Sequence, residues 1–456
     1  MTSASTAIDP ITELFNRRAT SNPGDPLNAV DPNTGPFAGL DPHGRRLACR
    51  PLFLGGGEVR RFEADLMAVT AILADLPRRL FDGDAERVCR ALDLSPDQAA
   101  LLGRLGARPT PPFGRVDAYH DGESIKILEF NASSDVGGLE WIGPATRALL
   151  EFDGFRSFAD EYGLYYVDGE AMLTGALREA GHAVRPGAEP VIALIEGPGG
   201  LREYGHSWVK YQRVLRDRGL ECHLGEISDL RFDGTGVRCG DARVDVVYRL
   251  FELAQVLGDP ASLRLARQLR DAAAADRVAL WTPLETEIHR NKRWMAYLSD
   301  PRLRTFLTGE ERTLVDRVLP WTRALTPATP GSDPGLLDYC RANRERLVLK
   351  PDMGFNGRGV VFGWLTADRT WIAELNKAVR TGAVIQRRVV PRPEAVVDPG
   401  TGRTTLWDAC LGLFWMPGGF AGGCARFVPS GALPTADEQT LISGVFLYPD
   451  EVLATA

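Results

Sequence analysis

Two short strings of residues constrain the fold more than any other part of this chain. Residues 114–117 read Gly-Arg-Val-Asp, and residues 128–131 read Leu-Glu-Phe-Asn. The turn signal Asp121-Gly122 lies between them. This pattern predicts a hairpin of two antiparallel strands, with the second string at the end of the second strand.

The side chains of this hairpin carry the first candidate site. Because side chains alternate across a strand, Arg115 and Asp117 share one face of the first strand. On the second strand the residues expected to share a face are Ile125, Ile127, Glu129 and Asn131. An arginine, two carboxylates and an amide on one sheet face are the groups needed to hold divalent cations and a polyphosphate.

The register of the hairpin decides whether these groups meet, and the sequence leaves two registers open. A two-residue loop at Asp121-Gly122 places Asp117 opposite Lys126, in an ordinary cross-strand ion pair. A loop longer by an odd number of residues, such as 122–124, places Asp117 opposite Glu129 and Arg115 opposite Asn131. Only the second register builds a site.

The composition is that of a globular protein with a sizeable core, since 44% of the 456 residues are hydrophobic and 25% are charged. The net charge of −7 argues against a general nucleic-acid or anionic-membrane surface. No apolar run approaches the roughly 20 residues of a membrane span, and the N-terminus lacks the pattern of a secretory signal. The seven cysteines are scattered without Cys-x-x-Cys spacing, which argues against zinc and disulfides and predicts a cytoplasmic protein.

The order of the expected elements predicts an α/β (α+β) fold. Apolar residues at helical spacing predict a helix over 61–81, and Ser95–Gln98 reads as a capping box that opens another. The apolar run Val191–Ile195 leads through glycines into a helix and further strands, which is a βαβ pattern. We expect four parts: an irregular lead-in with helices (1–110), the metal-binding hairpin (111–190), a βαβ subdomain on the substrate side (191–255) and a nucleotide-binding part (256–456).

A second chemical cluster lies in the last third of the chain. Residues 346–351 predict a strand that ends at Lys350, because the residue before Pro351 is pushed to extended geometry. The following residues, 352–360, contain three glycines and predict a flap whose backbone N–H groups can lie over phosphates. The alternative is a plain glycine-rich hairpin with a solvated lysine at its base.

Two further segments accompany this cluster. Residues 290–294 open a helix and supply a second lysine, Lys292, although a basic, solvated helix start would have the same pattern. Residues 383–389 predict an apolar strand that contains Gln386, although an ordinary sheet strand would read the same way.

Taken in order, these strings resemble the ATP-grasp ligases. In most ATP-grasp enzymes the metal-binding Glu and Asn follow the lysines, whereas here Glu129 and Asn131 precede Lys292 and Lys350. That permuted order is similar to the glutathionylspermidine synthetase group and to the eukaryotic-type glutathione synthetases. The resemblance covers residues 113–140 and 280–430, and it implies a permuted ATP-grasp fold.

The resemblance also implies roles for individual residues. Asp117, Glu129 and Asn131 would hold two Mg²⁺ ions, and Lys292 and Lys350 would grip the phosphates of ATP. Arg115 would steady the transferred phosphoryl group, with Arg426 near the reacting centre. The remaining nucleotide contacts would come from the glycine flap and from the backbone of the strand beside the adenine: Gly354, Asn356, Gly357, Gly359 and Gln386.

The implied activity is ligation of a small-molecule or peptide carboxylate to an amine through an acyl phosphate. Two alternatives remain open, namely a phosphotransferase that acts on a hydroxyl and a non-catalytic nucleotide-binding protein. The sequence identifies neither the acid nor the amine. A homodimer is left open, and neither nucleic acid nor a membrane is expected as a partner.

Overall fold

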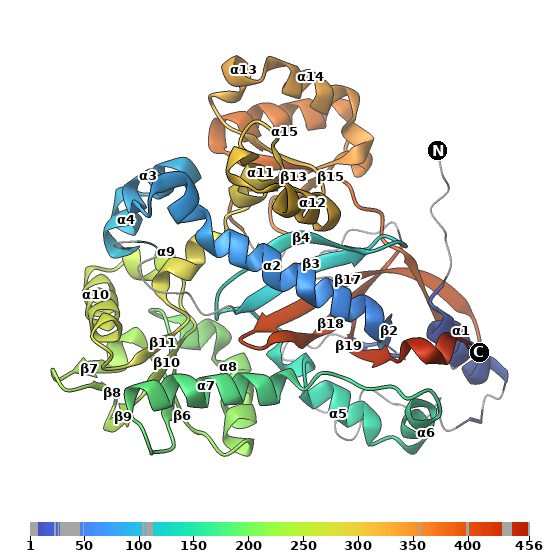
Figure 1. Ribbon diagram of the computed structural model, residues 1–456, viewed down its shortest axis with the longest axis horizontal. Helices are drawn as coiled ribbons and strands as arrows, with labels where there is room; N and C mark the ends of the chain where they lie inside the picture. Colours follow the sequence, from blue (N-terminus) through green and yellow to red (C-terminus); the bar gives the residue numbers. More distant parts are fainter. Residues whose placement is uncertain are drawn as a thin grey trace.

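An eight-stranded sheet at the centre of the molecule joins segments that are far apart in the sequence (Figure 1). The computed structural model describes residues 8–21, 24–25, 27, 46–48, 50–102, 105, 113–354, 357–397, 401–430 and 440–454. Six strands follow one another across the sheet: β1 (Arg46–Leu47), β19 (Leu441–Tyr448), β18 (Gly419–Pro429), β17 (Thr404–Met416), β3 (Gly114–His120) and β4 (Ile125–Asn131). Two more strands complete it, with β16 (Pro393–Val397) paired to β17 and β2 (Leu52–Gly55) paired to β19. The expected hairpin, β3 and β4, is therefore one end of a larger sheet.

Helix α2 (Gly56–Phe81) crosses one face of this sheet (Figure 1). The helix expected over 61–81 is thus confirmed, and it begins at Gly56. Its apolar side chains share a core with alternate residues of the strands, which are Leu66, Val69, Leu73 and Leu76 on α2 and Val116, Ala118, Leu411 and Ala425 on the sheet. Because side chains alternate, the residues between these must lie on the opposite face of the sheet.

A parallel sheet forms the second part of the molecule. Its strands lie in the order β11 (Ala279–Trp281), β10 (Val246–Arg249), β5 (Val191–Glu196) and β6 (Glu221–Glu226). All three pairings are parallel, with α8 (Gly200–Asp217) connecting β5 to β6. The expected βαβ unit is confirmed. A small antiparallel sheet follows β6 and consists of β7 (Leu230–Phe232), β8 (Val237–Cys239) and β9 (Ala242–Val244).

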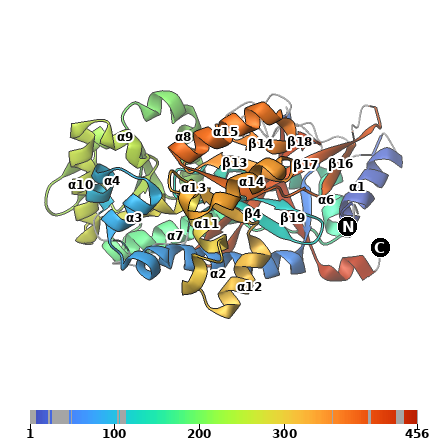
Figure 2. The same cartoon turned by 90° about the horizontal axis from the view of Figure 1, so that it is seen from above.

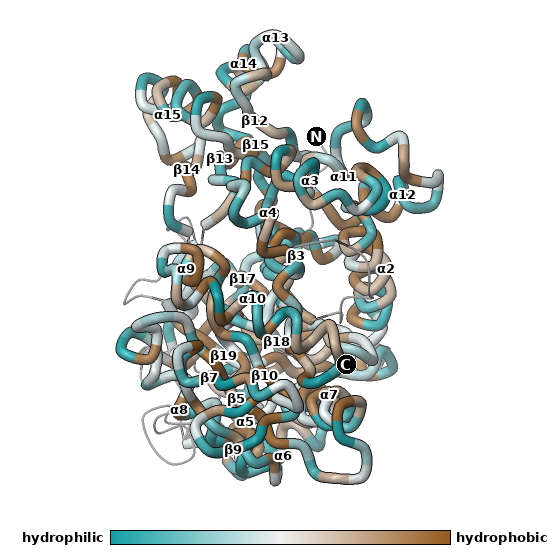
Figure 3. Tube along the Cα trace, turned by 90° about the vertical axis from the view of Figure 1, so that its left-hand side faces the viewer, coloured by the Kyte–Doolittle hydropathy of each residue, from teal (hydrophilic) through white to brown (hydrophobic). Residues whose placement is uncertain are grey.

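A four-stranded antiparallel sheet forms the third part and carries Lys350 and Gln386. Its order is β12 (Thr322–Leu325), β15 (Ala383–Arg387), β13 (Leu347–Pro351) and β14 (Val361–Phe362). Helices α14 (Pro334–Ala342) and α15 (Asp368–Thr381) pack on it through a separate apolar cluster. In Figures 1 and 3 this part stands at one end of the molecule, at the opposite end from the parallel sheet.

The remaining helices surround these sheets. From above, α10 and α1 lie at opposite ends of the long axis (Figure 2). The bounds are α1 (Pro10–Ser21), α3 (Ala85–Leu92), α4 (Pro96–Leu102), α5 (Pro144–Leu150), α6 (Asp153–Glu161), α7 (Gly169–Val184), α9 (Leu253–Leu257), α10 (Pro260–Ala274), α11 (Arg293–Ser299), α12 (Gly309–Val318) and α13 (Thr329–Ser332). Within the described ranges, no helix has both the length and the apolar character that crossing a membrane requires.

Helix α7 joins the central sheet to the parallel sheet. Its residues Leu173 and Leu177 share one apolar cluster with Leu194 of β5 and Phe414 of β17. At its first residue, Gly169, a Cβ atom would lie 2.0 Å from the carbonyl oxygen of Ala421 on β18. The close approach of the helix to the sheet therefore depends on the missing side chain.

This contact predicts opposite effects for two glycine substitutions in the same helix. Gly169→Ala should lower the free energy of unfolding by about 1–3 kcal/mol, because the added methyl group overpacks the junction with β18. Gly175→Ala is the control, since a Cβ atom there would meet nothing within 4 Å. It should raise the free energy of unfolding by about 0.5–1 kcal/mol through helix propensity. Urea unfolding followed by circular dichroism measures both, and equal effects would contradict the assignment.

Candidate active site

The hairpin of β3 and β4 brings the first set of candidate residues together. Asp117 is paired with Glu129, and Arg115 is paired with Asn131. The second expected register is therefore confirmed at this end of the hairpin, and the register that opposed Asp117 to Lys126 is wrong.

A β-bulge at Leu128 produces this register. The loop between the strands has four residues, 121–124, and near it Ala118 is paired with Ile127. That spacing alone would pair Asp117 with Leu128. Leu128 is instead the extra residue of a bulge, so that Asp117 meets Glu129. The odd-length loop expected from the sequence is replaced by an even loop and one bulged residue.

The bulge also changes which residues share a face. Ile125 and Ile127 pack into the core beneath α2, whereas Glu129 and Asn131 line a cavity on the opposite face. The expectation that these four side chains share one face is wrong, because an extra residue reverses the alternation of the strand.

The carbonyl group of Leu128 connects this strand to the third sheet. Lys350 donates a hydrogen bond from Nζ to the Leu128 oxygen at 3.0 Å, and Gln386 Nε2 lies 3.4 Å from the same oxygen. A bulged residue is left out of the ladder, which makes its carbonyl available to such donors. One oxygen thus ties the strand of Glu129 to the strand of the lysine.

Asp117 lies between two arginines. Its Oδ1 accepts a hydrogen bond from Arg115 Nε at 2.8 Å, and its Oδ2 accepts one from Arg426 Nη2 at 2.8 Å. Burial raises the pKa of the Asp117 carboxyl, but Arg115 and Arg426 outweigh burial and the pKa lies below its ordinary value. Asp117 is therefore ionised at neutral pH and holds both guanidinium groups on the cavity face of the sheet.

The two candidate lysines are buried beside the same strand. Lys292 Nζ lies 3.3 Å from Glu129 Oε2 and 3.4 Å from the carbonyl oxygen of Gly354. Lys292 and Lys350 are only 7% and 8% exposed, so a solvated basic helix start and a solvated hairpin lysine are both wrong as interpretations. Burial lowers the pKa of Lys350 to about 8, against the attraction of Glu129.

The glycine loop after β13 has the backbone geometry that favours glycine. Gly354, Gly357 and Gly359 have φ angles of 152°, 68° and 75°. Gly354 and Gly357 line the cavity, whereas Gly359 packs against Pro351. Asn356, which was expected in the flap, lies outside the described residues.

Gln386 lies on an inner strand of its sheet. It is paired with Thr322 on one side and with Val348 on the other. Its side chain contacts Thr322 and Leu128, and the residue lines the cavity together with its neighbours Arg387, Arg388 and Val389. The expectation that the backbone of this segment lines an adenine stays a prediction.

The candidate residues converge on one cavity of about 800 Å³. It is bounded by the central sheet, the parallel sheet and the four-stranded antiparallel sheet, because β3, β4, β17 and β18 supply one wall and β13, β15 and the carboxyl ends of β5 and β10 supply the others. The expected residues that line it are Arg115, Asp117, Glu129, Asn131, Lys292, Lys350, Gly354, Gly357, Gln386 and Arg426.

Other residues that line the cavity were not predicted from the sequence. Cys410 and Cys424 lie on the cavity face of β17 and β18, and burial raises the pKa of both thiols. Asp135 and Arg290 form a buried ion pair of 2.6 Å, and Glu252 lies beside it. Arg290 lies two residues before Lys292, and this position could have indicated that it lies near the cavity. Nothing in the sequence, however, linked it to Asp135.

The donor set fits a hard divalent cation in its chemistry. Asp117 and Glu129 supply carboxylates and Asn131 supplies an amide, whose Nδ2 is buried without a hydrogen-bond partner among the described residues. In the described part of the chain, however, no three His, Cys, Asp or Glu side chains form a ready metal cluster. Both carboxylates are instead paired with arginine or lysine, so a cation would have to compete with these partners.

Comparison by sequence gives limited matches. No protein-family model matches the chain. A protein of Frankia casuarinae with the provisional name glutamate–cysteine ligase 2-2 is 31% identical over 216 residues, which is 44% of this chain and 22% of that protein. The chain thus spans less than a quarter of the length of the curated relatives that it matches.

Comparison by structure covers nearly the whole chain. A glutathione synthetase-like effector from Globodera pallida matches 97% of this chain and 98% of its own, with a TM-score of 0.55 and 15% identity. A protein of Methylobacillus flagellatus, provisionally named gamma-glutamylcysteine synthetase, matches 80% of this chain and 84% of its own, with 16% identity and a TM-score of 0.42. The expected ATP-grasp α/β fold is confirmed, and so is the resemblance to the glutathione synthetase group at the level of the fold.

The burial of Lys350 predicts a variant that is more stable than the natural protein. The lowered pKa means that burying the charged lysine destabilises the fold below pH 8, and that this penalty disappears as the pH rises towards 10.5. Lys350→Met should therefore raise the free energy of unfolding by about 1–3 kcal/mol at pH 7.

The size of this gain should fall with rising pH, which urea unfolding at pH 7 and pH 10 measures. Lys377→Met is the control, because Lys377 is exposed and should change stability by less than about 0.5 kcal/mol. A Lys350→Met protein that is less stable than the natural one at pH 7 would show that the ammonium group contributes more through its hydrogen bond to Leu128 than its burial costs.

Proposed function

We propose that this protein is an ATP-dependent carboxylate–amine ligase that forms an amide bond through an acyl phosphate. The observation that carries the proposal is the convergence of Glu129 and Asn131 with Lys292 and Lys350 around one cavity. These pairs are more than 150 residues apart in the sequence, and neither pair alone would bind a metal-bound triphosphate. Two arginines, Arg115 and Arg426, stand beside them on the same sheet face.

The lysines and the glycine loop form the proposed nucleotide site. Lys292 and Lys350 supply point charges for the phosphates, and Gly354 and Gly357 let the backbone approach closely. The residues that would hold Mg²⁺ are Asp117, Glu129 and Asn131, and the metal would neutralise the charge of the triphosphate. Closure of the glycine loop would exclude water that could otherwise hydrolyse the acyl phosphate.

The reaction needs a carboxylate to be made electrophilic. A carboxylate oxygen attacks the γ-phosphorus of ATP, which forms an acyl phosphate and releases ADP. The amine then attacks the carbonyl carbon, the C–N bond forms, and the bond to phosphate breaks. Arg115 and Arg426 stabilise the negative charge that develops on the phosphoryl group and on the tetrahedral intermediate.

The proposed substrates follow from the names of the relatives, which concern glutamate and cysteine. We propose a small carboxylate and an amine of the amino-acid or peptide class, and the relation to glutathionylspermidine synthetases is part of this proposal. The first substrates to test are L-glutamate with L-cysteine, followed by γ-glutamylcysteine with glycine and by glutathione with spermidine. ADP release from ATP and Mg²⁺ in the presence of each pair identifies the active one.

Glu129→Gln tests the proposed metal site. The substitution keeps the size of the side chain but removes its charge, so Mg²⁺-dependent ADP release should fall at least about a hundredfold while the protein stays folded. Glu123→Gln is the matched control, since Glu123 is an exposed glutamate in the turn of the same hairpin and should leave turnover unchanged.

Trapping with hydroxylamine separates a ligase from a kinase. A ligase forms a hydroxamate from the acyl phosphate, whereas a phosphotransferase that acts on a hydroxyl forms none. Undiminished turnover in Glu129→Gln, or ADP release without hydroxamate from any carboxylate in the panel, would contradict the proposal.

A further inference from the structure

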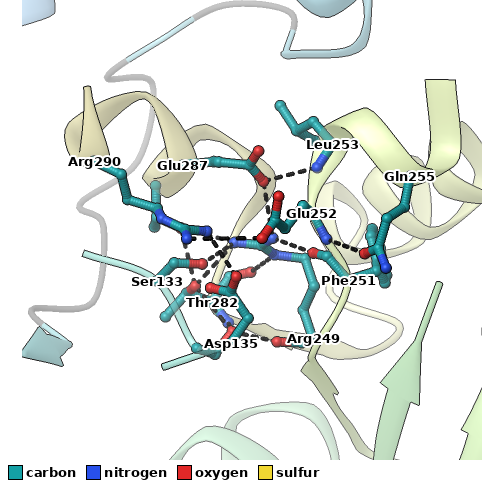
Figure 4. Close-up of polar contacts among 12 residues, drawn as sticks. Ser133, Asp135, Arg249, Phe251, Glu252, Leu253, Gln255, Thr282, Glu287 and Arg290 are labelled. Carbon is teal, nitrogen blue, oxygen red and sulfur yellow. Dashed lines mark hydrogen bonds and ion pairs between the residues drawn. The ribbon is translucent and has the colours of Figure 1, made fainter. Parts of the chain in front are cut away.

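A charged cluster lies where the parallel sheet meets the cavity (Figure 4). Arg290 lies between two carboxylates, with Nη1 2.6 Å from Asp135 Oδ2 and Nη2 3.8 Å from Glu252 Oε1. These three residues line the cavity. Behind them Arg249 Nη1 lies 3.3 Å from Glu287 Oε2, and both of these side chains are buried.

The cluster lies close to the proposed reacting groups because the chain ties it to them. Asp135 follows Asn131 by four residues, and Arg290 precedes Lys292 by two. An extended chain spans at most about 3.6 Å per residue, so these Cα atoms lie within roughly 14 Å and 7 Å of their site neighbours. Glu252 lies three residues beyond the end of β10, at the carboxyl edge of a parallel sheet, where α/β proteins commonly bind ligands.

Two acceptors in this cluster suit an amine. Glu252 is the N-cap residue of α9, its backbone N–H donates to Gln255 Oε1 at 2.8 Å, and its side chain is 31% exposed and lines the cavity. Asp135 is 7% exposed and also lines the cavity. An ammonium group that enters the cavity therefore meets two carboxylates, and hydrogen bonds between ionised groups are stronger than those between neutral ones.

The cluster has three carboxylates and two guanidinium groups. One negative charge is therefore uncompensated, which favours the binding of one proton. The pKa of Glu252 is raised to about 7, chiefly by burial and also by Asp135 and Glu287, while Arg290 and Arg249 act to lower it. Tyr204 on α8 lines the same cavity as Glu252.

Burial raises the pKa of Asp135 too, but Arg290 and Arg249 outweigh it and that pKa is lowered. Burial raises the pKa of Glu287 as well, but Glu287 is buried behind the cavity wall and accepts hydrogen bonds from Arg249 and from the N–H of Leu253. A proton that enters the cluster from the cavity therefore goes to Glu252, which lines that cavity.

Resting on the ligase function proposed above, we propose that Glu252 is the general base that receives the proton of the attacking ammonium group. The ammonium group donates to Asp135 and Glu252, and one proton passes to Glu252. The neutral amine then attacks the acyl phosphate carbonyl, the C–N bond forms, and phosphate leaves as hydrogen phosphate, which takes the second proton of the amine nitrogen. The proton on Glu252 returns to solvent, so the balance is one amide, one phosphate and one released proton. A pKa near the working pH suits a general base.

Two small nucleophiles that differ in basicity test this assignment without knowledge of the natural amine. Hydroxylamine is mostly unprotonated at neutral pH and needs no base, whereas hydrazine is mostly protonated and does. With the carboxylate that gives the highest ADP release, the natural protein should form both the hydroxamate and the hydrazide. The measured quantity is the ratio of the hydrazide rate to the hydroxamate rate between pH 6 and pH 9.

Glu252→Gln should lower this ratio at least about tenfold at pH 7, because the amide keeps the size of the side chain and leaves the backbone bond to Gln255 in place, but accepts no proton. The ratio should recover as the pH rises and hydrazine loses its proton in solution. Glu252→Asp keeps a carboxylate and should retain most of the ratio with the pH dependence of the natural protein. Circular dichroism and thermal unfolding establish that each variant is folded.

Glu196→Gln is the comparison variant. Burial raises the pKa of Glu196 to about 7 as well, but Trp208 and Gly197 hold its two carboxylate oxygens. Glu196→Gln should therefore change the rates of hydrazide and hydroxamate formation in equal proportion. An unchanged ratio in Glu252→Gln, or a lowered ratio in Glu196→Gln alone, would overturn the assignment. Absence of hydroxamate with the natural protein would instead overturn the ligase function itself, and with it this inference.

Discussion

The bulged residue Leu128 is the constraint on which the rest of the site depends. Its insertion turns Glu129 and Asn131 away from the core and towards the cavity, and opposite Asp117 and Arg115. Its carbonyl then accepts the hydrogen bond of Lys350 from a different sheet. A single extra residue thus determines both which side chains face the cavity and which strand of the third sheet lies beside them.

The elements with strong local signals could be predicted from the sequence. The helix at 61–81, the capping box at Ser95, the βαβ unit and the lysine-bearing strand each have a periodicity or a breaker that acts over a few residues. The bulge could not be predicted in this way, because its cost is repaid by contacts with Lys350 and Gln386, which lie more than 200 residues away. The Asp135–Arg290 pair was missed for the same reason, since its partners are distant in sequence.

Charge compensation explains how so many ionised groups can share one cavity. Asp117 neutralises two guanidinium groups only in part, and Glu129 is paired with Lys292. If the ligase proposal holds, the arginine and lysine side chains must leave these carboxylates to bind the triphosphate. The carboxylates then lack a positive partner, and Mg²⁺ must supply the compensating charge. Such a site favours the metal complex of the nucleotide over the free anion, because only the complex satisfies both sets of charges at once.

The order of strands in the central sheet has a consequence for how the protein folds while the ribosome synthesises it. The hairpin of β3 and β4 and the short strands β1 and β2 all pair directly with strands that lie beyond residue 403. A ribosome must therefore synthesise more than 280 further residues after β3 before its neighbour β17 exists. Helix α2 is already present to cover the apolar face of β3, but the hydrogen-bonding edge of this strand stays without its neighbour β17 during that time, so we expect the nascent chain to bind chaperones.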